Sequence, residues 1–373
     1  MKTIMIPGSL ALLLLLTGIP TCGAQAPSPT LKEAFKNDFL IGAAINRAQF
    51  FEEDPRGTPI IKAQFSSVSP ENVLKWESVH PAADQYDFAA ADRYVQFGES
   101  NHMYIIGHTL VWHSQTPPWV FQDAAGQPAT RETLLARMHD HIATVVGRYK
   151  GRIHGWDVVN EALNEDGTLR NSRWRRIIGD DYIEKAFQFA HEADPAAQLQ
   201  YNDYALENER KRNGAIALIK KLQSEGITVS AVGLQDHVKL DWPTTNQLEE
   251  TISAFAALGV KVMITELDVD VNPTSQRNHS ADVAAVAQQA ADLNLYAKGL
   301  PEAKQKQLAA RYAELFNVYV RHRADISRVT FWGVTDGDSW LNMRGRVNYP
   351  LLFDRQGRPK PAFDSVISQG TVP

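Results

Sequence analysis

Two glutamates follow runs of apolar residues, and their side chains are well placed in the sequence to do acid–base chemistry. The run WDVVNE (156–161) ends on Asn160 and Glu161, and the run VKVMITELDV (260–269) carries Glu266 near its end. A carboxylate at a strand end also has a simpler role, because it can cap a following helix or pair with a surface arginine. Two carboxylates that converge instead suit hydrolysis of a glycosidic bond, in which one is the general acid and the other a base or nucleophile.

Aromatic side chains favour the same chemistry. Four tryptophans lie at or just beyond the ends of strand-like runs, among amides and histidines: Trp76, Trp112, Trp332 and Trp340. Each could simply pack in a loop that covers the core. As a group they suit stacking on sugar faces, with polar groups nearby to bind the hydroxyls. The sequence therefore predicts a carbohydrate site.

Signatures of other catalytic classes are missing from the sequence. It has no Walker A run, no G-x-G-x-x-G between a strand and a helix, and no G-x-S-x-G elbow. His191-Glu192 begins like a zinc-protease helix, but Pro195 stands where the second histidine would be. His108 and His113 are five residues apart, which is not a usual spacing for metal ligands. We therefore expect no metal and no cofactor.

Eight strand-like runs alternate with helix-like runs along the chain. We expect strands at residues 39–45, 65–72, 103–112, 153–161, 198–204, 229–237, 260–269 and 329–336. Several are continuous apolar runs, as expected for parallel strands that are covered on both faces. Apolar residues recur at helical spacing in 130–148, 208–222 and 301–322, and Pro301 suits a first-turn position. This alternation predicts either an open doubly wound sheet or a closed (β/α)8 barrel.

The polar residues at the strand ends decide between these two folds. Nearly every run ends in groups that can hydrogen-bond: Glu71, Asn72, His108, Asn160, Glu161, Asn202, Gln235, His237, Glu266, Trp332 and Asp336. In a barrel all strand C-termini meet at one face, where the active site lies. An open sheet uses only the ends near its switch point. We therefore predict an α/β protein with a single (β/α)8 TIM barrel over residues 27–373.

Residues 1–26 have the pattern of a signal peptide. Lys2 supplies the positive charge, residues 10–16 form the apolar segment, and Ala24-Gln25-Ala26 offers a cleavage site. An alternative is a bacterial lipoprotein signal that ends before Cys22, which would give a lipid-anchored form. In either case we expect a secreted protein, extracellular or periplasmic.

Charge and cysteine content limit the partners. The net charge of −5 gives no general attraction to nucleic acid or to anionic lipid. No later apolar run reaches the roughly 20 residues of a transmembrane helix. The one cysteine, Cys22, lies in the leader, so the mature chain must depend on a large core, which its length can supply. We expect no nucleic-acid partner, no membrane contact unless Cys22 is lipidated, and a monomer.

Seven segments, in order along the chain, resemble those of glycoside hydrolase family 10, the barrel-fold endo-1,4-β-xylanases. They cover essentially the whole mature chain and are ENVLKWE (71–77), GHTLVWHSQ (107–115), WDVVNE (156–161), YNDY (201–204), GLQDH (233–237), TELDV (265–269) and FWGVTDGDSWL (331–341). One such segment would be weak support, but seven in the family's order are specific. The resemblance implies xylan and xylo-oligosaccharides as substrates.

The resemblance also implies roles for single residues. Glu161 would be the acid/base and Glu266 the nucleophile, with Asn160 on the sugar's 2-hydroxyl. His237 would hydrogen-bond Glu266 and be oriented by Asp268. The positions that match sugar-binding residues are Glu71, Asn72, Lys75, His108, Trp112, Gln235, Trp332 and Trp340 on the glycone side, and Asn202 and Tyr204 toward the leaving group.

Two points stay open at this stage. Asp236 is not the residue we would expect between Gln235 and His237, but along a strand its side chain should point away from the site. Retention of configuration needs carboxyl groups about 5–5.5 Å apart and a glycosyl-enzyme on Glu266, whereas inversion needs roughly 6.5–9.5 Å. The retaining mechanism is therefore implied by the resemblance alone.

Two other functions are compatible with the sequence. One is a mixed xylanase and cellulase on the same barrel, because crowding of the pocket, here by Trp332 and Trp340, must distinguish xylose from glucose. The other is a non-catalytic carbohydrate-binding barrel, which would need Glu161 or Glu266 to be misplaced.

Overall fold

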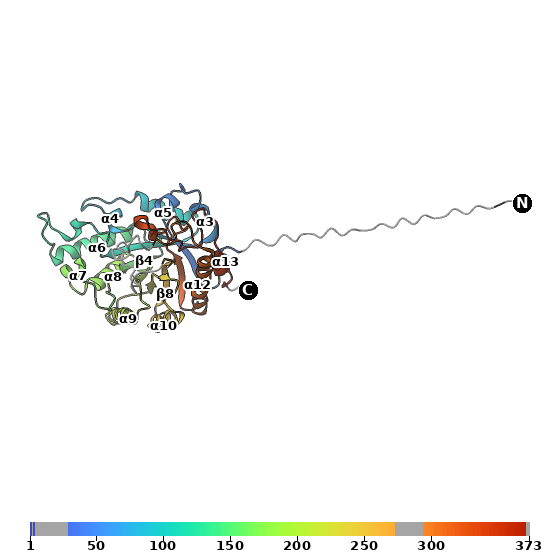
Figure 1. Ribbon diagram of the computed structural model, residues 1–373. Helices are drawn as coiled ribbons and strands as arrows, with labels where there is room; N and C mark the ends of the chain where they lie inside the picture. Colours follow the sequence, from blue (N-terminus) through green and yellow to red (C-terminus); the bar gives the residue numbers. More distant parts are fainter. Residues whose placement is uncertain (2, 4–28, 273–293, 371–373) are drawn as a thin grey trace.

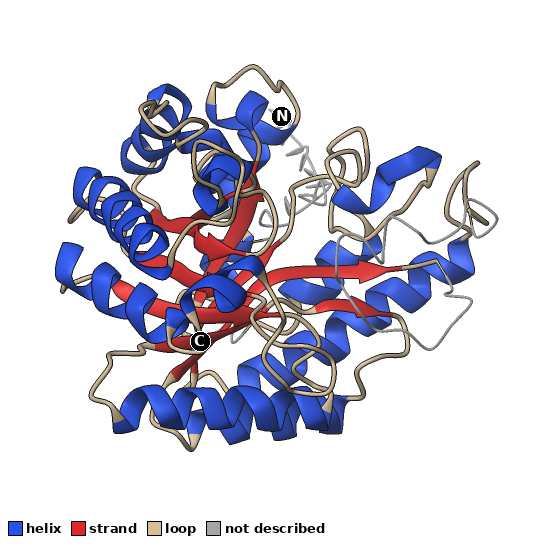
Figure 2. Ribbon diagram, turned by 90° about the vertical axis from the view of Figure 1, so that its left-hand side faces the viewer, coloured by secondary structure: helices blue, strands red, loops and turns tan. Residues whose placement is uncertain are grey.

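The computed structural model describes residues 1, 3, 29–272 and 294–370. The signal peptide predicted at 1–26, with Cys22, thus falls almost wholly outside the described residues. The described chain forms a central set of strands with helices packed around it (Figure 1, Figure 2). None of its described helices is both long and apolar enough to cross a membrane.

Parallel strands close into a barrel. Within the described residues, hydrogen bonds join the strands in the order β6-β5-β4-β3-β2-β1-β9-β8, and β6 also pairs with β8, which closes the ring. The short strand β7 pairs with the end of β8. The bounds are β1 (Leu40–Ile45), β2 (Ser67–Pro70), β3 (Tyr104–Trp112), β4 (Gly155–Asn160), β5 (Gln198–Asp203), β6 (Ala231–Leu234), β7 (His237–Lys239), β8 (Lys261–Asp270) and β9 (Ile326–Phe331). The (β/α)8 barrel predicted from the sequence is confirmed.

Helices connect the strands and cover the outside of the barrel (Figure 2). Those of the described chain are α1 (Leu31–Ala34), α2 (Arg47–Phe50), α3 (Gly57–Gln64), α4 (Trp76–Val79), α5 (Ala89–Ser100), η1 (Pro118–Phe121), α6 (Arg131–Arg148), α7 (Arg173–Ile178), α8 (Tyr182–Ala193), α9 (Glu209–Ser224), α10 (Thr245–Ala256), α12 (Glu302–Arg321), η3 (Trp340–Gly345) and α13 (Pro361–Ile367).

The three helices predicted from their apolar spacing are present as α6, α9 and α12. Side chains cap two of them: that of Thr130 accepts a hydrogen bond from the Thr133 N–H, and that of Asn208 accepts one from the Arg210 N–H. One detail of the prediction is wrong. Pro301 precedes α12 in an extended conformation and is not in its first turn, which begins at Glu302.

The run predicted as one strand over 229–237 is divided in two. Asp236 has a φ of 52°, a left-handed conformation that an extended strand cannot contain, so β6 ends at Leu234 and β7 begins at His237. The Asp236 carboxylate is buried and accepts a hydrogen bond of 2.6 Å from Tyr319 on α12. Its side chain therefore points away from the strand-end pocket, as the sequence predicted.

β3 and β4 pack closely where Trp156 faces Gly107. The Trp156 ring is buried over Gly107, where an added Cβ would lie 2.1 Å from the ring. Gly107 pairs with Trp156, and Trp112 pairs with Asn160, in the same parallel ladder. The lack of a side chain at Gly107 thus makes room for the Trp156 ring, and the register shifts between His108 and Val111 before Trp112 pairs with Asn160.

Candidate active site

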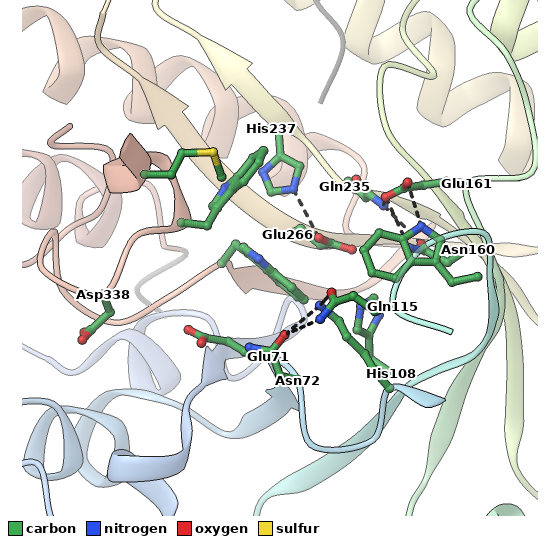
Figure 3. Close-up of a pocket in the computed structure, with 15 residues that line it drawn as sticks. Glu71, Asn72, His108, Gln115, Asn160, Glu161, Gln235, His237, Glu266 and Asp338 are labelled. Atoms are coloured by element: carbon green, nitrogen blue, oxygen red, sulfur yellow. Dashed lines mark hydrogen bonds and ion pairs between the residues drawn. The ribbon is translucent and has the colours of Figure 1, made fainter. Parts of the chain in front are cut away.

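A cavity of about 340 Å³ opens where the barrel strands end (Figure 3). Twelve of the fifteen residues predicted as site residues line it: Glu71, Asn72, Lys75, His108, Trp112, Asn160, Glu161, Gln235, His237, Glu266, Trp332 and Trp340. The other three, Asn202, Tyr204 and Asp268, are buried beside it. Polar residues predicted on different strands are thus brought to one place.

Three residues that line the cavity were not predicted: Gln115, Asp338 and Met343. Gln115 and Asp338 lie within two of the segments that carry the family resemblance. Their place in those segments could have identified them as candidate site residues. Met343 follows the last segment, in η3, and no pattern in the sequence marked it.

Glu161 sits just beyond β4 in a strained backbone conformation. Its φ is 56°, which costs on the order of 1–3 kcal/mol in a residue other than glycine. Two hydrogen bonds hold it there: its N–H donates to the Asn202 carbonyl at 2.9 Å, and Arg170 Nε donates to its carbonyl at 3.1 Å. The conformation turns the carboxyl group into the cavity instead of continuing the strand.

The Glu161 carboxyl group is buried and favours its protonated form. Trp112 Nε1 donates to Oε2 at 2.8 Å, and Gln235 Nε2 donates to Oε1 at 3.1 Å. Burial and then the charge of Asp203 raise the pKa of Glu161 to about 7, against these two hydrogen bonds, and Glu266 adds to the rise. A carboxyl group with this pKa can deliver a proton near neutral pH.

Glu266, on β8, is held in the opposite protonation state. Its carboxylate accepts from His237 Nε2 at 3.2 Å and from Asn202 Nδ2 at 2.8 Å. Burial opposes ionisation, but the hydrogen bond from His237 and the charges of His108 and His237 outweigh it and lower the pKa of Glu266. The surroundings of the two buried carboxyl groups therefore raise the pKa of Glu161 and lower that of Glu266.

His237 supplies a positive charge beside Glu266. Its Nδ1 lies 3.1 Å from Asp268 Oδ1, and Asp268 also accepts a hydrogen bond of 2.7 Å from Trp340 Nε1. Burial disfavours the charged ring, but Asp268 and Glu266 together raise the pKa of His237 to about 10. The imidazolium thus bridges the two acids and fixes the orientation of Glu266.

Side-chain amides connect the two glutamates. Asn202 Nδ2 donates to Glu266 and also to Asn160 Oδ1 at 2.9 Å, and Gln235 Nε2 donates to the same Asn160 oxygen at 3.2 Å. With its oxygen occupied in this way, Asn160 turns its Nδ2 toward Glu161 Oε1, at 3.3 Å (Figure 3). The two carboxyl groups are therefore fixed by one shared hydrogen-bond network.

The other end of the cavity combines a lysine with polar acceptors. Lys75 Nζ donates to Asn72 Oδ1 at 3.0 Å and to Gln115 Oε1 at 2.8 Å, and it lies 4.9 Å from the centre of the Trp112 ring. Burial and the charge of Asp338 raise the pKa of Glu71 to about 8. These groups can donate hydrogen bonds to, and accept them from, the hydroxyls of a neutral sugar.

The four tryptophans divide into two roles. Trp112, Trp332 and Trp340 line the cavity. Trp76 does not, because it is buried and its ring stacks on His141 with 3.7 Å between centroids. Of the two roles that the sequence left open for Trp76, the structure shows packing: its ring, at the start of α4, stacks on His141 of α6.

Tyr204 lies in a small cluster with Ala205, against which Trp242 and Trp340 pack. Its hydroxyl accepts a hydrogen bond of 2.9 Å from Arg170, the residue that also holds the Glu161 carbonyl. Within the described residues, no group of three or more His, Cys, Asp or Glu side chains could hold a metal ion.

A barrel with paired carboxyl groups and tryptophans at its strand ends defines a glycoside hydrolase. The model of glycosyl hydrolase family 10 matches residues 30–369, and the chain belongs to that family. Endo-1,4-beta-xylanase A of Xylanibacter ruminicola is 43% identical over 94% of this chain and 95% of its own.

Two further comparisons show the range of relatives. The solved structure of a family 10 endoxylanase from a sugarcane soil metagenome is 43% identical, with a TM-score of 0.85, over 92% of this chain and 99% of that one. Exoglucanase XynX of Acetivibrio thermocellus is 39% identical over 91% of this chain, which matches 29% of that longer protein.

Proposed function

We propose that this chain is a retaining endo-1,4-β-xylanase, with Glu161 as acid/base and Glu266 as nucleophile. The observation that carries the proposal is the pair of buried carboxyl groups in one cavity, of which Glu161 has a raised pKa and Glu266 a lowered one. The relatives named as xylanases support the choice of substrate.

The proposed mechanism assigns one task to each group. Glu161 gives its proton to the glycosidic oxygen while Glu266 attacks the anomeric carbon and forms a glycosyl-enzyme. The leaving sugar departs, and Glu161, now ionised, takes a proton from the water that hydrolyses the intermediate. His237 stabilises the Glu266 carboxylate before attack and after release, and Asn160 binds the 2-hydroxyl of the reacting sugar.

The pH dependence should follow the two pKa values. The rate on xylan is expected to fall as pH rises through about 7, because Glu161 then loses the proton it must donate. The acid limb should lie below the usual range of a glutamate, because the pKa of Glu266 is lowered. Profiles of kcat/KM for the wild type and for Glu161→Gln would check this, and an alkaline limb that survives in the variant would belong to another group.

Release of reducing sugar from purified xylan is the direct test of the function. An endo-acting enzyme should lower the viscosity of the solution early, before much reducing sugar appears. Rates on xylo- and cello-oligosaccharides of equal length would separate a xylanase from a mixed xylanase/cellulase, the alternative that the exoglucanase relative keeps open. Binding to xylan without any cleavage would favour the non-catalytic barrel instead.

Export is a further proposal. If residues 1–26 are a signal peptide, the mature protein recovered from the medium or periplasm should begin at position 27. A lipid-modified N-terminus at Cys22, found by mass spectrometry of the membrane fraction, would support the lipoprotein alternative.

A further inference from the structure

A buried ion pair lies close to Glu161 but outside the cavity. Lys211, on α9, places its Nζ 2.9 Å from Oδ1 of Asp203, the last residue of β5, and both side chains are fully buried. The Lys211 ammonium also lies 3.3 Å from the centre of the Tyr204 ring. A buried ion pair is costly to desolvate, so its place beside the proposed acid calls for an explanation.

The Asp203 carboxylate is fixed next to the residue that carries the acid. Asn160 pairs with Asn202 in the ladder between β4 and β5, so the residues that follow them, Glu161 and Asp203, are neighbours. The Asp203 carboxylate also accepts hydrogen bonds from the Tyr201 hydroxyl, from Tyr204 N at 2.9 Å, and from Leu163 N at 3.4 Å, two residues beyond Glu161.

Among the buried acids near Lys211, Asp203 is the one whose negative charge Lys211 balances. Glu207 is buried next to it, but burial and the charge of Asp236 raise the pKa of Glu207 well above its usual value, so Glu207 holds its proton. The Lys211 charge is therefore left to balance Asp203. Three hydrogen-bond donors and the Lys211 ammonium thus surround the Asp203 carboxylate and hold it in place.

Other charged groups face Glu161 from several elements. Glu266 faces it from β8, and the His113 ring, just after β3, has Nδ1 3.9 Å from Glu161 Oε2. Lys75, after β2, interacts with the Glu161 charge, and Arg170 contacts the Glu161 carbonyl. Positive charge on these basic groups would favour an ionised Glu161. Burial, the charge of Asp203 and the charge of Glu266 act in the opposite direction.

We propose that Asp203 is a positioning residue for Glu161: its negative charge, held in place by Lys211, keeps the catalytic proton on Glu161 between turnovers. The inference rests on the proposed role of Glu161 as the acid. It agrees with the rise in the pKa of Glu161, for which Asp203 is the largest cause after burial. Because like charges repel, removal of the Asp203 charge should make the proton easier to lose.

The test is the pH profile of kcat/KM on a xylo-oligosaccharide, whose leaving group needs a proton. Asp203→Asn keeps the shape of the side chain and removes its charge. We expect the alkaline limb to move to lower pH by roughly one unit. The rate on the acid side of that limb should stay within a few fold of wild type, because Glu161 is still protonated there.

A second variant keeps the test valid if Asp203→Asn alone fails to fold. Asp203→Asn alone leaves Lys211 buried without its counter-ion, whereas Asp203→Asn with Lys211→Met removes both charges together. The double variant should show a limb shift in the same direction, because it removes Asp203, the largest cause of the raised Glu161 pKa after burial.

Asp336→Asn with Lys360→Met is the matched control. Lys360 Nζ lies 2.9 Å from Asp336 in another buried ion pair, and neither residue lines the cavity. This control should lose stability and keep the alkaline limb of the wild type. A shift of equal size in the control would show a general effect of lost ion pairs and would overturn the inference.

The failure of this inference can be told from failure of the proposed function. If Glu161→Gln removes the alkaline limb but the folded Asp203 variants leave it in place, the role of Asp203 is wrong and that of Glu161 stands. If the limb survives in Glu161→Gln, the acid has been misassigned. A uniform loss of rate at every pH in the Asp203 variants would show a structural role only.

Discussion

Replacement of Glu161 with alanine is expected to lower kcat/KM on xylan by roughly 10²–10⁴-fold, the usual contribution of a general acid. The same change should cost far less in the first step on an aryl xylobioside with a dinitrophenolate leaving group. That phenolate departs without a proton, so the acid is not needed for bond cleavage. A burst of phenolate followed by slow turnover would show that only the second step has lost its general base.

Rescue by azide tests whether the lost activity of Glu161→Ala comes from the missing carboxyl group. The space left by alanine at position 161 can admit a small anion, which needs no general base to attack the glycosyl-enzyme. Added azide should therefore speed turnover of the variant on the aryl substrate and give a glycosyl azide as product. Glu165→Ala is a matched control, because Glu165 is exposed in the same loop and should behave as wild type. Equal loss on xylan and on the aryl substrate would rule out Glu161 as the acid.

The positions of the catalytic candidates could be predicted because the barrel links sequence order to space. Parallel strands buried on both faces read as continuous apolar runs, and each run that ended in a polar residue delivered that residue to the same face. Glu161 and Glu266 are far apart in the chain, yet they line one cavity for this reason.

Other features depend on contacts that no local pattern contains. Trp76 and Trp340 look alike in the sequence, but Trp76 stacks on His141 while Trp340 borders the cavity. The break at Asp236 needs a left-handed backbone that aspartate adopts only occasionally. Lys211 reads as one more charge at the start of a helix, and only the fold shows that it is buried against Asp203.

The electrostatics of the cavity also explain why two chemically identical side chains can take different roles. Glu161 is buried, accepts hydrogen bonds from neutral donors and lies near the charge of Asp203, whereas Glu266 accepts a hydrogen bond from a charged His237. Apart from the family resemblance, no residue pattern distinguishes the acid from the nucleophile. Their order as acid and nucleophile follows from these neighbours.

Replacement of Glu266 with alanine should have the largest effect of all. Without the nucleophile no glycosyl-enzyme can form, and we expect kcat to fall by roughly 10⁵-fold or more on xylan and on the aryl xylobioside alike, as in other enzymes that lose a covalent nucleophile. This lack of dependence on the leaving group distinguishes Glu266→Ala from Glu161→Ala.

A 2-fluoro xylobioside with a good leaving group tests the covalent step itself. The fluorine slows both steps, and the good leaving group restores the first, so the glycosyl-enzyme should accumulate on the wild type and be found by mass spectrometry on a peptide that contains Glu266. Glu161→Ala should still become labelled, because this substrate needs no proton, and Glu266→Ala should not. A label on any other residue would refute the assignment of Glu266. Inverted product configuration by NMR would instead mean that a water stands between the two carboxyl groups, at a separation of roughly 6.5–9.5 Å.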